Sequence, residues 1–248
     1  HLAKLMRYRP ESAGVKSFHG SQFNPSRYLL DDDPTGYYHQ RWVKGIVLAS
    51  AREGNRQVAI RATFGSDWRS DIELRNMIEA GVKGILEAEK ELGGKTKGVF
   101  ILGIRKDVSL EKARWIARQW TALRREWERE RPEYAPKLFG IDSMGLEEKF
   151  DFKKHAEVFK EASRAGQVVM YHVGEFWDRG FLQGALKNLE MAVSSGFVSV
   201  ITNPVSLFVD PGSLPDELYD QEKRLEIAAL QKRITAELAK RSIVVEIS

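Results

Sequence analysis

From Gln57 onward the chain alternates between short apolar runs and amphipathic helical patterns, and this alternation restricts the fold more than any other feature. The apolar runs are rich in β-branched residues and almost continuously apolar, which is typical of parallel strands that are buried on both faces. They predict six strands, at 58–64, 98–104, 137–142, 167–173, 197–202 and 242–247.

Between these runs lie five segments whose apolar residues recur on one helical face. The first is expected to begin with a capping box at Ser70. The second is expected to begin near Ser109, with an apolar face that consists of Ile116, Trp120, Leu123 and Trp127. In the last helix, which follows Pro215, the expected buried face consists of Leu225, Ala229, Ile234 and Leu238.

Five consecutive strand–helix units and a sixth strand favour a (β/α)8 TIM-type barrel, with an open doubly wound sheet as the alternative. No glycine-rich phosphate loop follows any of the runs, which argues against the nucleotide-binding open sheets. A complete barrel needs eight strands, so we expect this chain to contain part of one. We assign 57–248 to the barrel and 1–56 to an N-terminal helical and loop segment of the same domain.

The composition excludes several function classes. The net charge of +4 comes from interleaved acidic and basic residues, so the sequence gives no direct signal for nucleic-acid binding. The chain has no cysteine, so any metal must be held by His, Asp or Glu. No apolar run approaches the roughly 18 residues of a membrane span, and no signal peptide is recognisable, so we expect no membrane partner and a cytoplasmic location.

Four polar residues lie where predicted strands end. Active sites of such barrels lie at the C-terminal ends of the strands, and this rule selects Asp142, His172, Glu175 and Asn203. A neutral imidazole can bind zinc, and a neighbouring carboxylic acid can protonate a ring nitrogen or a leaving amine. The spacing H-x-x-E alone is weakly specific, and a hydrogen-bonded histidine at the edge of the core is the simpler interpretation.

Two motifs together resemble the adenosine deaminases of the metal-dependent hydrolase superfamily. GIDSMGLEE at 140–148 resembles their G-x-D-x-x-G-x-E segment, and YHVGE at 171–175 resembles their H-A-G-E motif. The stretch from VDPGSLPDE to RSIVVEIS also resembles that family, although Ser248 replaces a cysteine. The likeness extends over 57–248 and implies that this segment supplies strands two to seven of the barrel.

The resemblance implies roles for individual residues. His172 would be a ligand of Zn²⁺, and Glu175 would be the acid that protonates the purine ring. The backbone of Gly145 would contact the purine edge. Asp142 would support the floor of the pocket, or alternatively cap the loop that follows it.

The sequence also departs from the family. Asn203 stands where the family has the histidine that deprotonates the attacking water, and an amide cannot take up a proton. His1 resembles the end of the first-strand H-x-H motif, which supplies zinc ligands in the family, so the resemblance makes His1 a second candidate ligand of Zn²⁺, although chance or a tag remnant explains it equally well. The resemblance implies that the paired aspartates of the family's last strand would lie beyond Ser248. We therefore expect a partial view of a larger polypeptide, with a degenerate deaminase or a shifted alignment at Asn203 as alternatives.

These observations favour a zinc-dependent adenosine deaminase-like hydrolase with a purine nucleoside as substrate. One alternative is a catalytically impaired homologue that serves as an assembly or binding subunit, for example in a bacterial phage-defence complex. Another is an AMP or adenine deaminase. The oligomeric state stays open, and a homo-oligomer is compatible with the sequence.

Overall fold

The computed structural model describes residues 35–63, 71–147, 149–175 and 180–247. Within these residues six strands form one sheet, in which all neighbours are parallel and the strand order follows the chain. The expected six strands are confirmed with boundaries that differ by a few residues. They are β1 (Gln57–Thr63), β2 (Lys97–Arg105), β3 (Leu138–Met144), β4 (Val168–His172), β5 (Val200–Thr202) and β6 (Val244–Glu246).

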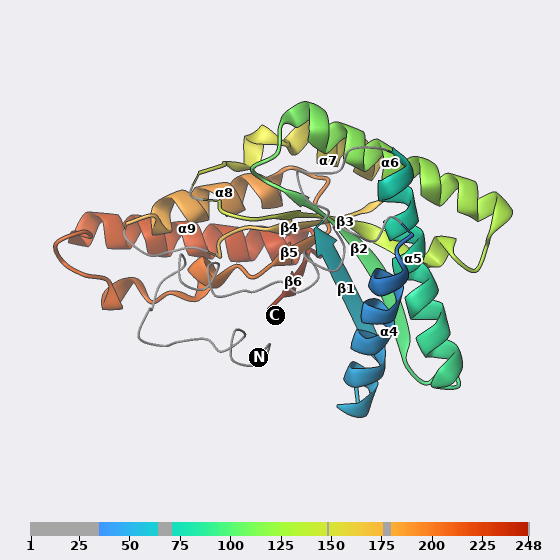
Figure 1. Ribbon diagram of the computed structural model, residues 1–248. Helices are drawn as coiled ribbons and strands as arrows, with labels where there is room; N and C mark the ends of the chain where they lie inside the picture. Colours follow the sequence, from blue (N-terminus) through green and yellow to red (C-terminus); the bar gives the residue numbers. More distant parts are fainter. Residues whose placement is uncertain (1–34, 64–70, 148, 176–179, 248) are drawn as a thin grey trace, which may run out of the picture.

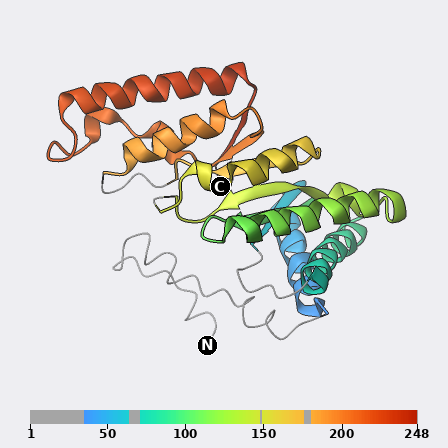
Figure 2. The ribbon, with the colours of Figure 1, turned by 90° about the horizontal axis from the view of Figure 1, so that it is seen from above.

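The helices lie along the outer face of the curved sheet and leave its inner face uncovered by them (Figures 1 and 2). The arrangement is a half-barrel of six parallel strands. The helices are α4 (Tyr37–Arg52), α5 (Asp71–Glu91), α6 (Leu110–Glu130), α7 (Ala156–Arg164), α8 (Leu182–Ser194) and α9 (Gln221–Lys240). Single 3-10 turns occur at η2 (Ala135–Lys137), η3 (Phe152–Lys154), η4 (Val205–Phe208) and η5 (Pro211–Ser213).

The two faces of the sheet differ because side chains alternate along each strand. Phe100, Leu102 and Ile104 of β2 belong to the large apolar core between the sheet and the helices. Burying such a side chain contributes about 1.5–3 kcal/mol. A small inner cluster contains Ile101, Met170 and Val200. Polar groups can therefore occupy much of the inner face.

The helix α6 forms as the sequence predicts. The hydroxyl of Ser109 accepts the backbone N–H of Lys112 at 3.1 Å, which caps the helix. The expected apolar face is confirmed, because Ile116, Trp120, Leu123 and Trp127 are all buried. The capping box proposed at Ser70 lies outside the described residues.

In α9 the predicted buried face was wrong in part. Leu225 is 63% exposed and Ala229 is also exposed, whereas Ile234 and Leu238 are buried as expected. The buried stripe instead continues through Ile227 and Leu230. Its spacings of three and four residues follow the helical period, whereas a stripe from Leu225 would drift away from α8. None of the helices in the described residues is long and apolar enough to cross a membrane.

Candidate active site

The Asp142–His172 pair lies at the C-terminal ends of β3 and β4. The ring Nδ1 of His172 is 3.0 Å from the Asp142 carboxylate. Asp142 is completely buried and His172 is 8% exposed. With the Nδ1 proton donated to the carboxylate, the second ring nitrogen, Nε2, keeps a lone pair for another partner.

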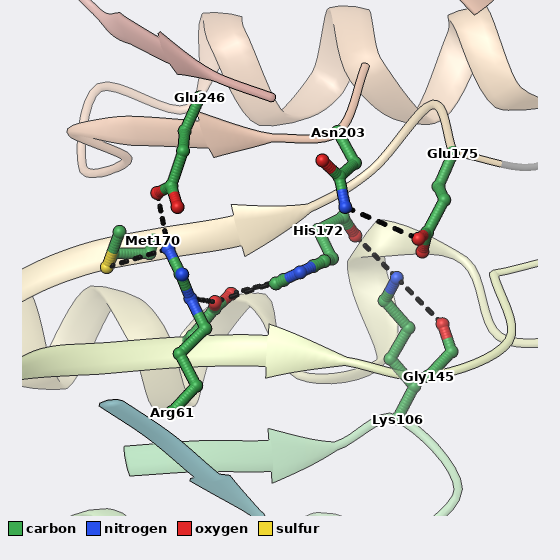
Figure 3. Close-up of polar contacts among 9 residues, drawn as sticks. Arg61, Lys106, Gly145, Met170, His172, Glu175, Asn203 and Glu246 are labelled. Atoms are coloured by element: carbon green, nitrogen blue, oxygen red, sulfur yellow. Dashed lines mark hydrogen bonds and ion pairs between the residues drawn. The ribbon is translucent and has the colours of Figure 1, made fainter. Parts of the chain in front are cut away.

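Arg61 connects this pair to the far strand of the sheet. Its Nε donates to Asp142 Oδ2 at 2.9 Å, and its guanidinium also forms an ion pair with Glu246 (Figure 3). Burial lowers the pKa of Arg61, but the contacts with Glu246 and Asp142 outweigh burial and raise the pKa overall. Side chains from β1, β3, β4 and β6 thus form one charged network on the inner face.

Lys106 holds two loops of the site together. It is only 3% exposed, and its Nζ donates to the carbonyl oxygen of His172 at 2.5 Å and to that of Gly145 at 3.3 Å (Figure 3). Burial lowers the pKa of this ammonium, while the charges of nearby carboxylates, Glu147 first, oppose the shift. The end of β4 is thereby fixed against the loop that follows β3.

The turn between His172 and Glu175 is fixed by contacts on both sides. Glu147, which is buried, accepts the N–H of Gly174 at 2.9 Å, and the Gly174 carbonyl accepts the N–H of Ser206 at 2.7 Å. Gly174 has φ +79°, and a Cβ there would lie 2.6 Å from the Ser206 hydroxyl. Only glycine therefore fits this turn without strain.

Glu175 and Asn203 are brought together across β4 and β5. The Asn203 Nδ2 lies 3.5 Å from Glu175 Oε1, a long contact (Figure 3). The backbone N–H of Asn203 donates to the Glu246 carbonyl at 2.8 Å. Asn203 has φ +54°, a left-handed conformation that asparagine tolerates better than most residues. The amide can orient the carboxylate, but it cannot act as a base.

These residues provide only part of the ligand set that a zinc ion needs. A carboxylate on one ring nitrogen of His172 is the usual support of a metal-ligating histidine. However, the described part of the chain contains no group of three His, Asp or Glu side chains placed to hold a metal. The predicted ligand His1 lies outside the described residues. The described residues therefore do not form a metal centre by themselves.

The structure thus brings Asp142, His172, Glu175 and Asn203 to one end of the sheet, and it places Gly145, with φ +106°, in the loop beside them. Their proposed roles stay predictions. Sequence reasoning missed four charged residues that support the site. A charge within or just after an apolar run is the signal that marks three of them, Arg61, Lys106 and Glu246. The fourth, Glu147, is the last residue of the G-x-D-x-x-G-x-E segment, although no role was assigned to it.

No protein-family model and no curated protein sequence matches this chain. Several solved structures share its fold. A zinc-bound amidohydrolase from Burkholderia ambifaria aligns with a TM-score of 0.62 and 15% identity, over 93% of this chain and 64% of that protein. Adenine deaminase from Arthrobacter aurescens gives a TM-score of 0.61 at 14% identity, over 100% of this chain and 70% of that protein.

A third structure, the N6-methyl-AMP deaminase of Arabidopsis thaliana, aligns with a TM-score of 0.56 and 14% identity, over 94% of this chain and 67% of that enzyme. The chain therefore spans about two thirds of the length of these proteins. At such identities the likeness concerns the fold. The resemblance to purine deaminases is confirmed at that level: the chain has the fold of part of the amidohydrolase-type deaminases.

Proposed function

We propose that this chain carries part of the site of a purine-deaminating hydrolase, in which water replaces the amino group of adenosine or deoxyadenosine, giving inosine or deoxyinosine and releasing ammonia. The observation that supports this most is the histidine oriented by a buried carboxylate, His172 with Asp142, followed by Glu175 on a fixed turn. All three lie at the strand ends where barrel enzymes place their catalytic groups.

In this proposal the chain's own residues bind the purine and move one proton. Glu175 protonates the purine ring nitrogen, which makes the ring more open to attack by water. Asn203 orients the Glu175 carboxylate through its amide. The backbone of Gly145 contacts the purine edge, and Lys106 holds that loop in place.

The activation of water requires a further group. In metal-dependent hydrolases zinc lowers the pKa of a bound water towards neutrality. His172 is our candidate for one ligand, and the remaining ligands would have to come from outside the described residues. We therefore assign no step to a metal held by these residues alone.

The test is adenosine and deoxyadenosine deamination by the full-length protein, followed through the ultraviolet absorbance of the purine. Glu175→Gln is expected to lower kcat by about 10²- to 10⁴-fold without unfolding the protein. Glu157→Gln, an exposed change on α7, is the matched control and should leave turnover unchanged. Turnover that survives Glu175→Gln would refute the role of Glu175. Turnover that survives a chelator would refute the metal requirement.

A second candidate is a deaminase homologue that binds nucleosides or assembles with partners without catalysis. Asn203 favours it, because an amide beside Glu175 cannot deprotonate water. This candidate predicts that the folded full-length protein binds adenosine but shows no zinc-dependent turnover of adenosine, AMP or adenine. Measurable turnover would exclude it. We also propose that the protein is located in the cytoplasm, and that residues 1–56 and 57–248 belong to one domain.

A further inference from the structure

A cavity of about 540 Å³ lies outside the network around His172, between the segment that follows β3 and the helix α8. One wall comes from residues 147–154, and the other from residues 181–191. The two walls are joined by a hydrogen bond from the Phe152 backbone N–H to Asn188 Oδ1 at 3.3 Å. The volume is in the range of small-molecule sites, roughly 300–1,000 Å³.

Four lysines line this cavity, which we call the lysine pocket: Lys149, Lys153, Lys154 and Lys187. Within the described part of the chain, Lys149, Lys153 and Lys187 form no ion pair with an acidic side chain. Elsewhere in the molecule charges are mostly interleaved, and many lysines and arginines have acidic partners. Unneutralised charges of one sign that share a cavity favour an anionic ligand.

The side chain of Lys154 is held by two contacts. Its Nζ donates to the Lys106 carbonyl at 2.7 Å and lies 4.1 Å from the centre of the Phe150 ring. An ammonium group has three protons, so this contact leaves two for a ligand. The lysine is therefore held in place while part of its donor capacity stays unused.

The two carboxylates of the lysine pocket are already engaged by backbone amides. Asp151 accepts the N–H of Lys154 at 3.2 Å, and Glu147 accepts the N–H of Gly174 at 2.9 Å. With four lysines and two carboxylates the lining carries a formal charge of 4 − 2 = +2. The positive charge is thus in excess where a ligand would contact the lysines.

Apart from Asn188, the uncharged side chains of the lining are apolar or aromatic. Phe150, Phe181 and Met191 contribute to it. Gly184 lets Phe181 lie against α8, because a Cβ at this position would come within 2.7 Å of the Phe181 ring. Such a wall suits a flat or apolar group attached to the anion.

We propose that the lysine pocket binds a phosphate dianion, either as inorganic phosphate or as the phosphate group of a nucleoside monophosphate whose base rests against the aromatic wall. The pocket is distinct from the candidate active site, and the proposal does not depend on the deaminase function. Two of its lining residues, Glu147 and Lys154, also contact Gly174 and Lys106, which support that site.

The test is calorimetric titration of the full-length protein with inorganic phosphate, AMP and adenosine. The variant Lys153→Gln/Lys187→Gln should weaken phosphate and AMP binding by about tenfold or more, since each lysine contributes a charged hydrogen bond. The control Lys90→Gln/Lys232→Gln removes the same charge from exposed positions on α5 and α9 and should leave both affinities unchanged. Adenosine affinity should be unaffected by either pair.

The titrations also separate the two sources of phosphate. If AMP binds more tightly than inorganic phosphate, the ligand of the lysine pocket is a nucleotide. If the two affinities are equal, the ligand is free phosphate. Either result supports the proposal. It is overturned if neither ligand binds, or if both lysine pairs weaken binding equally. It is also overturned if Glu175→Gln weakens AMP binding while the Lys153/Lys187 variant does not. Turnover of adenosine, measured separately, tests the deaminase proposal alone.

Discussion

The Nδ1 atom of His172 lies 3.0 Å from the carboxylate of Asp142, and this contact follows from the register of two strands. Asp142 of β3 is paired with Met170 of β4, two residues before His172, so all three face the inside of the half-barrel. Because Asp142 is also held by Arg61, the imidazole has one preferred orientation. The arrangement fixes which ring nitrogen is presented to a ligand.

Asp142→Asn should lower kcat/KM for deamination by about 10- to 100-fold, the usual cost of losing a carboxylate that supports a ligand histidine. The amide can still accept the Nδ1 proton, but it lacks the charge that makes the imidazole a good donor. Zinc content and kcat/KM of the full-length protein are the measurements. Asp216→Asn, at a fully accessible position, is the control. Unchanged kinetics in Asp142→Asn would mean that the contact only packs the core.

The effects of substituting Arg61 and Asp142 on the free energy of unfolding should depend on each other. Arg61→Met leaves a buried carboxylate without its partner, and the expected loss is about 3–5 kcal/mol in the free energy of unfolding. The double variant Arg61→Met/Asp142→Asn should lose less than the sum of the single losses. The Glu246 side chain is 31% exposed, so Glu246→Gln should cost less than Arg61→Met. Urea unfolding measures all four variants, and additive losses would contradict the coupling.

Lys106→Met should destabilise the protein and impair the site. The change removes the donor to the carbonyl oxygens of His172 and Gly145. Each buried acceptor left without a partner lowers the free energy of unfolding by about 1–3 kcal/mol. The loop that follows β3 would then move relative to the end of β4, so we expect KM to rise in addition to the loss of stability. Lys83→Met on α5 is the matched control and should stay within about 0.5 kcal/mol. Equal stability in the two variants would show that water replaces the Lys106 contacts.

Much of the fold could be predicted from the sequence, because the strands and helices follow local periodicity. The continuous apolar runs gave six parallel strands, and Ser109 with the stripe from Ile116 gave α6. The face of α9 was predicted wrongly in part, because the predicted set contains a step of five residues, from Ala229 to Ile234. The buried stripe through Ile227 and Leu230 keeps the spacings of three and four residues of a helix, and α9 packs against α8.

The candidate site could be predicted only where a residue ends a strand. Asp142 and His172 were found in that way, but their direct contact depends on the register between β3 and β4. Arg61 contacts Glu246, and Lys106 contacts His172. In each pair the two residues are more than 60 positions apart in the sequence, so no local pattern reveals these contacts. Long-range pairing of charges is a property of the folded sheet.

His155 should make the stability depend on pH. The ring is buried, and its Nε2 lies 3.1 Å from the Val108 carbonyl oxygen, so the neutral ring donates to it. Burial, more than any other influence, lowers the pKa of His155 below its ordinary value of 6.5. The Val108 carbonyl and Asp107 oppose this shift, and Lys154 and Lys106 add to it.

In the unfolded chain His155 takes up a proton near pH 6.5, whereas the folded protein keeps the ring neutral to a lower pH. The unfolded state therefore binds more protons in this window, so the stabilisation is complete above about pH 6.5 and is lost as the pH falls towards the folded pKa. His155→Gln should remove this dependence, because a glutamine amide can donate to Val108 without titrating. Urea unfolding between about pH 7.5 and about pH 5.5 measures both proteins. Identical slopes of unfolding free energy against pH would show that His155 is protonated equally in the folded and unfolded chains.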